Sequence, residues 1–316
     1  MADNLMRFDL AVRYLSGRLS SFFLSLEKED KLRIREIRLR TGRPVVVITE
    51  RGAEFITTAF RLTQVYSDLI LKTDETEINE IFRRLCSYSV HSFTESINRG
   101  YITVAGGHRA GVAGTAVTEN GKITAVRDIC SINLRIAREI KGAADDIYKS
   151  YFREGISSVI IAGPPSSGKT TVLRDLARQL SGEERAKFLK IFICDERGEL
   201  GAAVSGSVQN DIGINSDILT FYPKAQGIMI GLRSFSPDII ICDEIATEEE
   251  AAAVEAGVNG GVHFVLSMHA KNERELRAKP IMKRLLMSGE FEDVVLLSGQ
   301  DVGKTLKSFK AGELLD

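Results

Sequence analysis

A glycine-rich segment with one lysine gives the strongest chemical signal in the sequence. Residues 163–170 read Gly-Pro-Pro-Ser-Ser-Gly-Lys-Thr, which fits the pattern G-x-x-x-x-G-K-[ST] in full. An apolar run precedes this phosphate loop and a helical pattern follows it, as the motif requires. Glycines let the backbone approach phosphate oxygens, and successive N–H groups at a helix start attract anions. We therefore expect nucleotide binding by Gly163, Pro164, Pro165, Ser166, Ser167, Gly168, Lys169, Thr170 and Thr171.

Two side chains at the end of this loop have distinct expected roles. Lys169 reaches the β- and γ-phosphates of ATP as a mobile point charge, and Thr170 offers its hydroxyl to Mg²⁺. The alternative interpretation is a glycine turn that carries a surface lysine. The fit to the whole pattern, in its proper context, favours nucleotide binding.

A pair of carboxylates follows the most apolar run of the second half. Ile239–Cys242 predicts a buried strand, and Asp243 and Glu244 come at its carboxyl end. Hydrolysis of a bound nucleotide needs a metal anchor and a group that orients water. We expect Asp243 to hold Mg²⁺ together with Thr170, and Glu244 to polarise the attacking water. The alternative is a strand that ends in surface acids.

Polar residues stand at the ends of two more apolar strands. Residues 195–199 read Asp-Glu-Arg-Gly-Glu after the strand expected at Phe188–Cys194, and residues 267–269 read Ser-Met-His. In an open parallel sheet, ligands gather at the carboxyl ends of the strands. We expect Glu196 to be a second catalytic or metal-shell carboxylate and His269 to sense the γ-phosphate. A solvated turn and a histidine satisfied by local hydrogen bonds are the alternatives.

A second glycine-lysine segment looks similar but lacks the required spacing. Residues 299–305 read Gly-Gln-Asp-Val-Gly-Lys-Thr, with only three residues between the glycines. No change from an apolar strand to a helix surrounds them. We interpret this segment as a turn near the C-terminal edge of the fold.

The elements that position these residues form an alternating pattern. Short apolar strands alternate with helices, one of which begins at Lys169 and another of which covers Glu248–Ala256. This alternation is typical of a parallel sheet with helices on both faces. The predicted fold class of this half is therefore α/β. Its expected strands are Ser158–Ala162, Phe188–Cys194, Ile239–Cys242 and His263–Ser267.

The first half of the chain has a different pattern, with short strands, tight turns and a helix. Glu36–Arg40 alternates with period two, and a turn at Thr41–Pro44 separates it from the β-branched run Val45–Ile48. Residues 74–90 predict a helix that Thr73 or Asp74 caps. Tight turns between short strands are expected at Gly106-Gly107 and Asn120-Gly121.

Length and composition agree with a two-part protein. At about 150 residues per domain, 316 residues suggest two domains. We expect a smaller α+β N-terminal domain at residues 1–140 and a P-loop ATPase domain at residues 141–316. With 44% hydrophobic and 27% charged residues, disorder, a collagen-like repeat and a disulfide scaffold are all disfavoured.

Charge and cysteine content narrow the expected partners and compartment. The 42 basic and 43 acidic residues give a net charge of −1, so no global basic field attracts nucleic acid or an anionic membrane. None of Cys86, Cys130, Cys194 and Cys242 forms a C-x-x-C pair, so no zinc site is indicated and a reducing cytoplasm is favoured. The apolar stretch Leu15–Leu26 is too short to span a bilayer. A helix that packs on the protein itself is favoured there, and attachment to a membrane surface is the alternative.

The order of the motifs resembles the secretion-type traffic ATPases of type II and type IV secretion and pilus systems. Those proteins place a helix ending in Leu-Arg and then Pro-Asp before the acidic strand, as Leu232-Arg233 and Pro237-Asp238 stand here. The likeness covers about residues 155–275 and implies a RecA-like P-loop NTPase core. It also implies that Glu196 and Glu199 lie in the family's Asp box, that Glu244 matches its Walker B glutamate and His269 its His box.

A likeness over nearly the whole chain is closer. Residues 36–44, 106–111 and 135–140 (Glu-Ile-Arg-Leu-Arg-Thr-Gly-Arg-Pro, Gly-Gly-His-Arg-Ala-Gly and Arg-Ile-Ala-Arg-Glu-Ile) resemble the family of stage III sporulation protein AA. That resemblance implies a hexameric ATPase that is made in the mother cell. It also implies work on a secretion-like channel complex at the membrane that faces the forespore. We therefore expect a cytoplasmic protein, peripheral at a membrane through its protein partners.

Two departures from the traffic ATPases matter. Those proteins usually end the acidic strand in Gly-Glu, whereas this chain has Asp243-Glu244, which favours a more usual magnesium arrangement. They also often carry a tetracysteine zinc insert, which this chain lacks.

An arginine from a neighbouring subunit or domain completes many such ATPase sites. Arg109, Arg127, Arg135 and Arg138 lie in the region that joins the two halves, and each is a candidate; a salt-bridged or solvated arginine is the alternative. Arg233 is interpreted as structural or intersubunit.

Two other function classes remain open from the sequence alone. A nucleic-acid-dependent P-loop ATPase would share the core but add a basic stripe with aromatic residues, which the net charge and the absence of tryptophan do not support. A nucleotide-sensing module would bind ATP with negligible turnover. Stimulation by single-stranded DNA tests the first, and the variant Glu244→Gln tests the second.

Overall fold

The chain divides into two compact units in a computed structural model that describes residues 2–182, 188–204, 206–299 and 301–315. The first unit comprises Met1–Glu139 together with Val204–Gln209. The second comprises Ile140–Ala203 and Asn210–Asp316. The segment at 204–209 therefore lies with the first unit although it interrupts the second in sequence.

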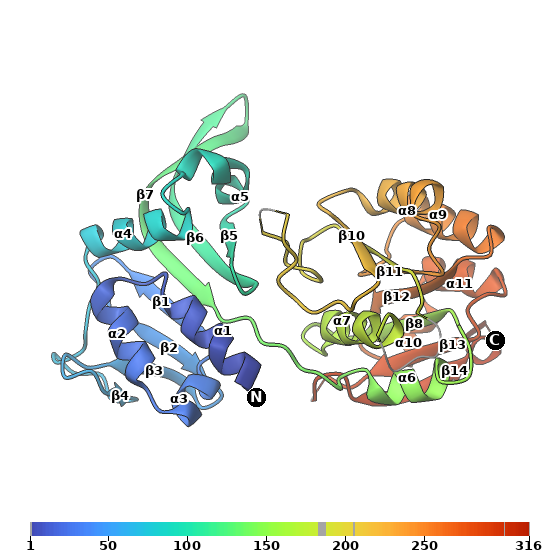
Figure 1. Cartoon of the computed structure of the whole chain (residues 1–316), viewed down its shortest axis with the longest axis horizontal. Coiled ribbons are helices and arrows are strands. Elements are labelled where there is room, and N and C mark those ends of the chain that lie inside the picture. Colours follow the sequence, from blue (N-terminus) through green and yellow to red (C-terminus); the bar gives the residue numbers. More distant parts are fainter. Residues whose placement is uncertain (1, 183–187, 205, 300, 316) are drawn as a thin grey trace. The chain divides into compact units, whose positions relative to one another are not determined.

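A seven-stranded sheet forms the centre of the first unit (Figure 1). Its strand order is β4-β3-β2-β1-β7-β6-β5, and each neighbouring pair is antiparallel. The strands are β1 (Glu36–Arg40), β2 (Val46–Thr49), β3 (Gly52–Ile56), β4 (Leu62–Thr63), β5 (Tyr101–Val104), β6 (His108–Glu119) and β7 (Lys122–Arg135). The helices are α1 (Ala2–Val12), α2 (Gly17–Ser25), α3 (Lys28–Arg33), α4 (Glu75–Leu85), η1 (Val90–Phe93) and α5 (Thr94–Asn98).

Alternating burial along β1 explains how this sheet packs. Ile37 and Leu39 are fully buried whereas Arg38 is exposed, so one face of the sheet belongs to the core. Apolar residues of α1, α2 and α4 join the same hydrophobic cluster. The helix α2 buries Leu19, Phe22 and Phe23 there, which confirms that the apolar stretch near the N-terminus packs on the protein itself.

The helix α4 has the predicted cap but is shorter than predicted. Asp74 caps α4, because its carboxylate accepts a hydrogen bond from the Glu77 N–H at 2.8 Å. The helix ends at Leu85 and not near residue 90, since Ser87 and Tyr88 adopt positive φ angles of 47° and 60° that a helix cannot continue. The tight turn at Asn120-Gly121 is confirmed, with φ angles of 50° and 75°.

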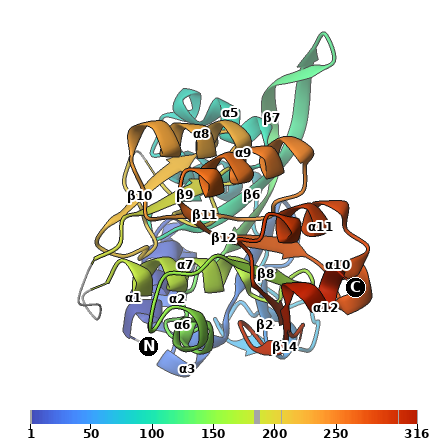
Figure 2. The same ribbon diagram turned by 90° about the vertical axis from the view of Figure 1, so that its right-hand side faces the viewer.

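A second seven-stranded sheet organises the other unit (Figure 2). Its order is β10-β9-β11-β12-β8-β13-β14, and the pairs are parallel except for β14, which runs antiparallel to β13. The strands are β8 (Val159–Gly163), β9 (Ile191–Asp195), β10 (Ser216–Thr220), β11 (Ile239–Cys242), β12 (His263–His269), β13 (Asp293–Leu297) and β14 (Thr305–Lys310). The helices are α6 (Asp145–Tyr151), α7 (Lys169–Leu180), α8 (Lys224–Ser234), α9 (Glu248–Asn259), α10 (Glu273–Arg277), α11 (Pro280–Met287) and α12 (Ala311–Leu315).

Helices cover both faces of this sheet, as the continuous apolar strands require. Figure 2 shows α8 and α9 on one side of the strands and α7 on the other. Side chains of β11 alternate between the two faces. Cys242 therefore joins the cluster under α8 and α9, while Ile241 and the following Asp243 turn toward the side of α7. This alternation decides which groups reach the phosphate loop.

Candidate nucleotide site

The phosphate loop lies between the end of β8 and the start of α7, as the sequence predicts. Gly168 is the residue before α7 and has a φ of +91°, a conformation that favours glycine. A Cβ atom on Gly163 would lie 2.4 Å from the Ser167 hydroxyl. The two glycines of the motif are thus required by backbone conformation and by close approach.

Lys169 folds back onto the loop that precedes it. Its ammonium donates hydrogen bonds to the backbone oxygens of Gly163 at 2.9 Å and Pro164 at 3.0 Å. Burial lowers the pKa of Lys169, and the carboxylates of Asp243 and Glu244 oppose that shift. The Ser167 hydroxyl is buried and has no hydrogen-bond partner among the described residues. A half-buried cation beside an unsatisfied hydroxyl suits the anionic oxygens of a nucleotide.

The carboxylate of Asp243 reaches the phosphate loop at the first turn of α7. The Thr170 hydroxyl donates to Asp243 Oδ2 at 2.8 Å, and the Ser267 hydroxyl donates to the other oxygen. In the sheet order, β12 lies beside β11, so Ser267 on β12 reaches the acidic strand end and holds Asp243 from that side. The expected metal anchors, Thr170 and Asp243, are therefore already in contact.

Glu244 has an unusual backbone conformation, with a φ of +57°. Its N–H donates to the Ser267 hydroxyl at 2.9 Å. Its carboxylate forms an ion pair with Arg197 at 2.6 Å, and the Arg197 side chain is largely exposed. The described surroundings thus hold a residue that would otherwise avoid this region of φ and ψ.

The polar residues after β9 serve two different purposes. The carboxylate of Asp195 is buried and accepts three backbone N–H groups, from Glu199 at 2.8 Å and from Leu200 and Gly201 at 3.0 Å. Burial raises the pKa of Asp195, while these three hydrogen bonds oppose the rise. Asp195 therefore shapes the turn, and Glu196 projects beside Asp243 and Glu244 into a small common cavity.

His269 lies at the end of β12, directly opposite Gly163 in the parallel register. The next residue extends the pairing, because the Ala270 N–H donates to the backbone oxygen of Gly163 at 3.2 Å. The sequence predicted that this strand ends at Ser267, but in the structure it continues to His269. His269 thus lies beside the start of the phosphate loop, and its role as a γ-phosphate sensor stays a prediction.

Three contributors to the site were not assigned from the sequence. Ser267 links Asp243 to Glu244, and its place in Ser-x-His was the only available signal. Arg197 lies within the polar run after β9, but nothing in that run indicates its contact with Glu244. Lys224 lies 20 positions before Glu244, and its ammonium donates to the backbone oxygen of Glu244 at 2.7 Å. Nothing local to Lys224 indicates this contact, which depends on how α8 packs beside β11.

The second glycine-lysine segment is confirmed as a turn between β13 and β14, except that Thr305 already begins β14. Gln300 lies outside the described residues. The turn also contacts the phosphate loop, since the Gly303 N–H donates to the Ser167 oxygen at 3.1 Å. A Cβ atom on Gly168 would lie 2.6 Å from Val302. The turn therefore packs closely against the loop.

The candidate arginines of the first unit have partners within that unit. Arg138 donates to the backbone oxygens of Lys31 and Ile34 at 3.2 and 2.7 Å. The Arg109 guanidinium lies 3.6 Å from the centre of the Tyr101 ring. Arg127 pairs with the adjacent Asp128. Any role of these side chains, or of Arg135, as an arginine finger stays a prediction, as does the structural or intersubunit role of Arg233 in α8.

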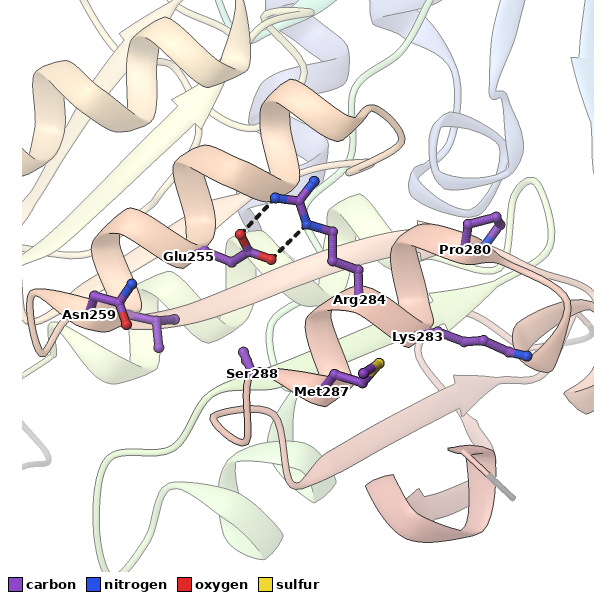
Figure 3. A pocket seen from close by; sticks show the side chains of 8 residues that line it. Glu255, Asn259, Pro280, Lys283, Arg284, Met287 and Ser288 are labelled. Atoms are coloured by element: carbon purple, nitrogen blue, oxygen red, sulfur yellow. Dashed lines mark hydrogen bonds and ion pairs between the residues drawn. The ribbon is translucent and has the colours of Figure 1, made fainter.

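A separate groove of about 620 Å³ lies between α9 and α11 (Figure 3). Arg284 crosses it and forms two hydrogen bonds of 2.7 Å with the Glu255 carboxylate. Val258, Pro280 and Met287 supply apolar lining. No residue of the phosphate loop or of the acidic strand ends lines this groove, so it is separate from the nucleotide site.

The donor set around the phosphate loop fits a magnesium ion held with a nucleotide. Among the residues that the structure describes, no three His, Cys, Asp or Glu side chains cluster to form a protein-only metal site. A hydroxyl and one carboxylate, Thr170 and Asp243, suit Mg²⁺ because this ion usually keeps water and phosphate ligands. In the same described ranges, no helix is long and apolar enough to cross a membrane.

The chain matches a known protein family and curated relatives of it. The profile of the family described as "Sporulation stage III, protein AA" matches residues 8–310. The chain is 36% identical over 274 residues to "Stage III sporulation protein AA" of Bacillus subtilis (strain 168), covering 86% of this chain and 85% of that protein. It is 30% identical over 183 residues to "Protein SEEDLING PLASTID DEVELOPMENT 1" of Arabidopsis thaliana, covering 55% of this chain but 25% of that protein.

Solved structures show the fold. The ATPase DotB of Legionella pneumophila superposes with a TM-score of 0.51 and 17% identity, covering 85% of this chain and 73% of DotB. The pilus retraction motor PilT with bound ADP superposes with a TM-score of 0.53 and 16% identity, covering 83% of this chain and 74% of PilT. The expected fold class is thus confirmed: an α/β, RecA-like P-loop NTPase core with a smaller α+β N-terminal domain.

Proposed function

The chain belongs to the family of sporulation stage III protein AA, and we propose that it is a Mg²⁺-dependent ATP hydrolase. The hydrogen bond between Thr170 and Asp243 is the observation that carries this proposal. It joins the last residue of the phosphate loop to the acidic strand end, so the groups that bind phosphate and metal already converge. We also propose residues 1–140 and 141–316 as the two domains.

The proposed binding step uses the phosphate loop and its helix. Backbone N–H groups of residues 163–170 surround the phosphates, and Lys169 exchanges its contacts to Gly163 and Pro164 for the β- and γ-phosphates. Thr170 and Asp243 hold Mg²⁺, which neutralises charge on the phosphate oxygens when it is bound. Thr171 follows in the first turn of α7 and completes the expected binding segment.

The proposed chemical step is attack of water on the γ-phosphate, which yields ADP and phosphate. Glu244 orients and polarises that water after its carboxylate leaves Arg197. Glu196 and His269 contact the transferred phosphate from the ends of β9 and β12, the two strands that flank β11. Loss of these contacts after hydrolysis shifts the positions of the two domains.

The proposed biological output follows from the family. We propose that the protein forms a ring, most simply a hexamer, and energises a membrane-associated secretion-like channel complex between mother cell and forespore during sporulation. It would act in the cytoplasm and reach the membrane through subunits of that complex. DotB and PilT support a motor of this type through their fold. No specific nucleic acid is proposed as a partner.

Calorimetry and turnover test the enzymatic part. We expect the wild type to bind Mg·ATP and to release phosphate, and Lys169→Ala to lose ATP affinity by about tenfold or more because a charge-assisted contact is removed. Glu244→Gln should keep ATP binding and lose about 100-fold or more in rate. Equal, negligible turnover by the wild type and Glu244→Gln would instead identify a nucleotide-sensing module.

Two further measurements test the assembly and the partner class. Mass in solution, measured with and without ATP for the wild type and Lys169→Ala, should show a ring that depends on nucleotide. A protein that stays monomeric at high concentration with every nucleotide contradicts the ring. Strong stimulation of the ATPase by single-stranded DNA would favour a nucleic-acid-dependent ATPase instead.

A further inference from the structure

A buried lysine stands behind the proposed catalytic carboxylates. We infer that Lys224, the first residue of α8, is a positioning residue that sets Glu244 and Glu196 for hydrolysis. This inference rests on the proposed function, because it assigns Lys224 a role in that reaction. Lys224 acts through the two glutamates and needs no contact with the nucleotide.

The contacts of the Lys224 ammonium are specific. It lies 2.7 Å from the backbone oxygen of Glu244, 3.3 Å from Glu196 Oε2 and 3.2 Å from Glu250 Oε1. A lysine ammonium has three donors, and these three acceptors match them in number. The ammonium therefore joins the ends of two neighbouring strands, β9 and β11, to the first turn of α9.

Burial and charge show that Lys224 does not stabilise its own helix, α8. Its side chain is 7% exposed, although lysine is rarely buried without partners. A cation at the first position of a helix also opposes the helix dipole. The two carboxylates outweigh both costs, so the position of this lysine is set by the groups that it joins.

Glu250 extends this network to the segment that follows Glu244. Its other oxygen accepts the N–H groups of Ala246 at 2.8 Å and Thr247 at 3.0 Å. Lys224 thus holds one end of the segment through the Glu244 oxygen and the other end through Glu250. Residues 244–247 are fixed from both sides.

This fixation matters because Glu244 adopts a left-handed backbone, with a φ of +57°. On one side of the residue, Ser267 accepts the Glu244 N–H. On the other, Lys224 holds the Glu244 oxygen. The N–H of the same peptide, from Ile245, donates to the Ser267 backbone oxygen at 3.0 Å, so the peptide after Glu244 has two anchors. Without the lysine, the Glu244 oxygen loses its partner, and the carboxylate is held less firmly in its direction toward the substrate. A small error in the direction of a catalytic group is costly, since about 1 Å of displacement can reduce a rate about 100-fold.

Lys224→Met tests the inference, because methionine keeps the length and removes the donors. We expect kcat to fall by about 100-fold while KM and ATP affinity stay within about threefold of the wild type. Hydrogen exchange of the amides at residues 244–247 should become faster, since the anchor of their segment is lost. Lys224→Arg should restore part of kcat because it restores a donor to the same acceptors. Lys149→Met, on the exposed face of α6, is the matched control and should change none of these quantities.

A second variant covers the case in which Lys224→Met unfolds. Lys224→Met combined with Glu250→Gln removes one uncompensated carboxylate, while the glutamine oxygen can still accept the N–H groups of Ala246 and Thr247. We expect this double variant to fold with normal ATP affinity, a low kcat and fast exchange at 244–247. Wild-type kcat in whichever of the two variants is folded overturns the inference.

The outcomes for this inference and for the proposed function differ. A wild type that binds ATP but never hydrolyses it contradicts the proposed function. Hydrogen exchange in Lys224→Met then still tests whether Lys224 holds residues 244–247 in place. Unchanged exchange at 244–247 in folded Lys224→Met overturns the inference whether or not the wild type is active.

Discussion

The Thr170 hydroxyl lies 2.8 Å from Asp243 Oδ2 and joins the start of α7 to the end of β11. The other Asp243 oxygen accepts the Ser267 hydroxyl, so the carboxylate is oriented before any metal binds. A carboxylate with both oxygens engaged has little freedom to reorient. Metal affinity should therefore depend on Asp243 more steeply than nucleotide affinity does.

We expect Asp243→Asn to raise the Mg²⁺ concentration for half-maximal ATPase by about 10- to 100-fold, because the amide carries no charge. Titration of the ATPase with Mg²⁺ measures this shift. Binding of ATP in the absence of Mg²⁺ should change little, since the phosphate loop is intact. The matched control is Asp217→Asn on the exposed side of β10, which should leave the titration unchanged. The same Mg²⁺ requirement in Asp243→Asn and the wild type would remove Asp243 from the metal site.

Ser267→Ala should uncouple the acidic pair from β12. Ser267 is fully buried, and its hydroxyl donates to Asp243 and accepts from the Glu244 N–H, so alanine leaves that N–H unsatisfied. We expect a loss of about 1–3 kcal/mol in the free energy of unfolding. We also expect a large loss of kcat with ATP binding retained. Denaturant unfolding and ATPase assays measure the two effects.

Ser181→Ala is the control for that variant. Ser181 directly follows α7 and is also fully buried, and its hydroxyl donates to the backbone oxygen of Ala177 in that helix at 3.0 Å. Alanine there should reduce stability without loss of kcat. If both serine variants lost stability and kept full kcat, Ser267 would be a structural hydroxyl alone.

The phosphate loop was predictable because all its determinants are local. Eight consecutive residues specify the turn, the glycines and the start of α7, and the structure places them between β8 and α7. The acidic strand end was predictable for a similar reason, since an apolar run followed by Asp243-Glu244 fixes where the strand stops. Which side chains face α7 then follows from strand alternation.

The remaining features depend on contacts between distant segments. Ser267 reaches Asp243 and Glu244 because β12 pairs with β11, an order that no local pattern gives. Lys224 reaches Glu244 through the packing of α8. The segment Val204–Gln209 packs with the first unit, where the Gln209 side chain accepts the Gly106 N–H at 2.8 Å. A sequence pattern alone cannot specify such pairings.

His108 should make the first unit sensitive to acid. Its ring is fully buried, and the Ala137 N–H donates to Nδ1 at 3.0 Å. Burial, assisted by the nearby Arg7 charge, lowers the pKa of His108 from 6.5 to about 4. Between those values the unfolded chain binds the proton and the folded chain does not, so stability falls as the pH drops from 6.5 toward 4. The full effect is roughly 3 kcal/mol.

Hydrogen exchange of β6 and β7 amides between pH 4 and 7 measures this loss. We expect His108→Gln to show a shallower pH dependence than the wild type, because glutamine does not titrate. His91→Gln, which replaces an exposed histidine, should keep the wild-type dependence. Identical pH dependence in His108→Gln and the wild type would exclude His108 as the source.

Gly168→Ala should damage the phosphate loop through its backbone and its neighbours. Residue 168 has a φ of +91°, and an added Cβ would lie 2.6 Å from Val302 and 2.9 Å from the Gly303 nitrogen. A strained conformation of this kind costs about 1–3 kcal/mol, so we expect ATP affinity to fall by about 10- to 100-fold. Gly155→Ala is the matched control, because a Cβ there meets no atom within 4 Å. Calorimetry with Mg·ATP compares the two variants, and equal affinities would show that nucleotide binding does not depend on the left-handed turn before α7.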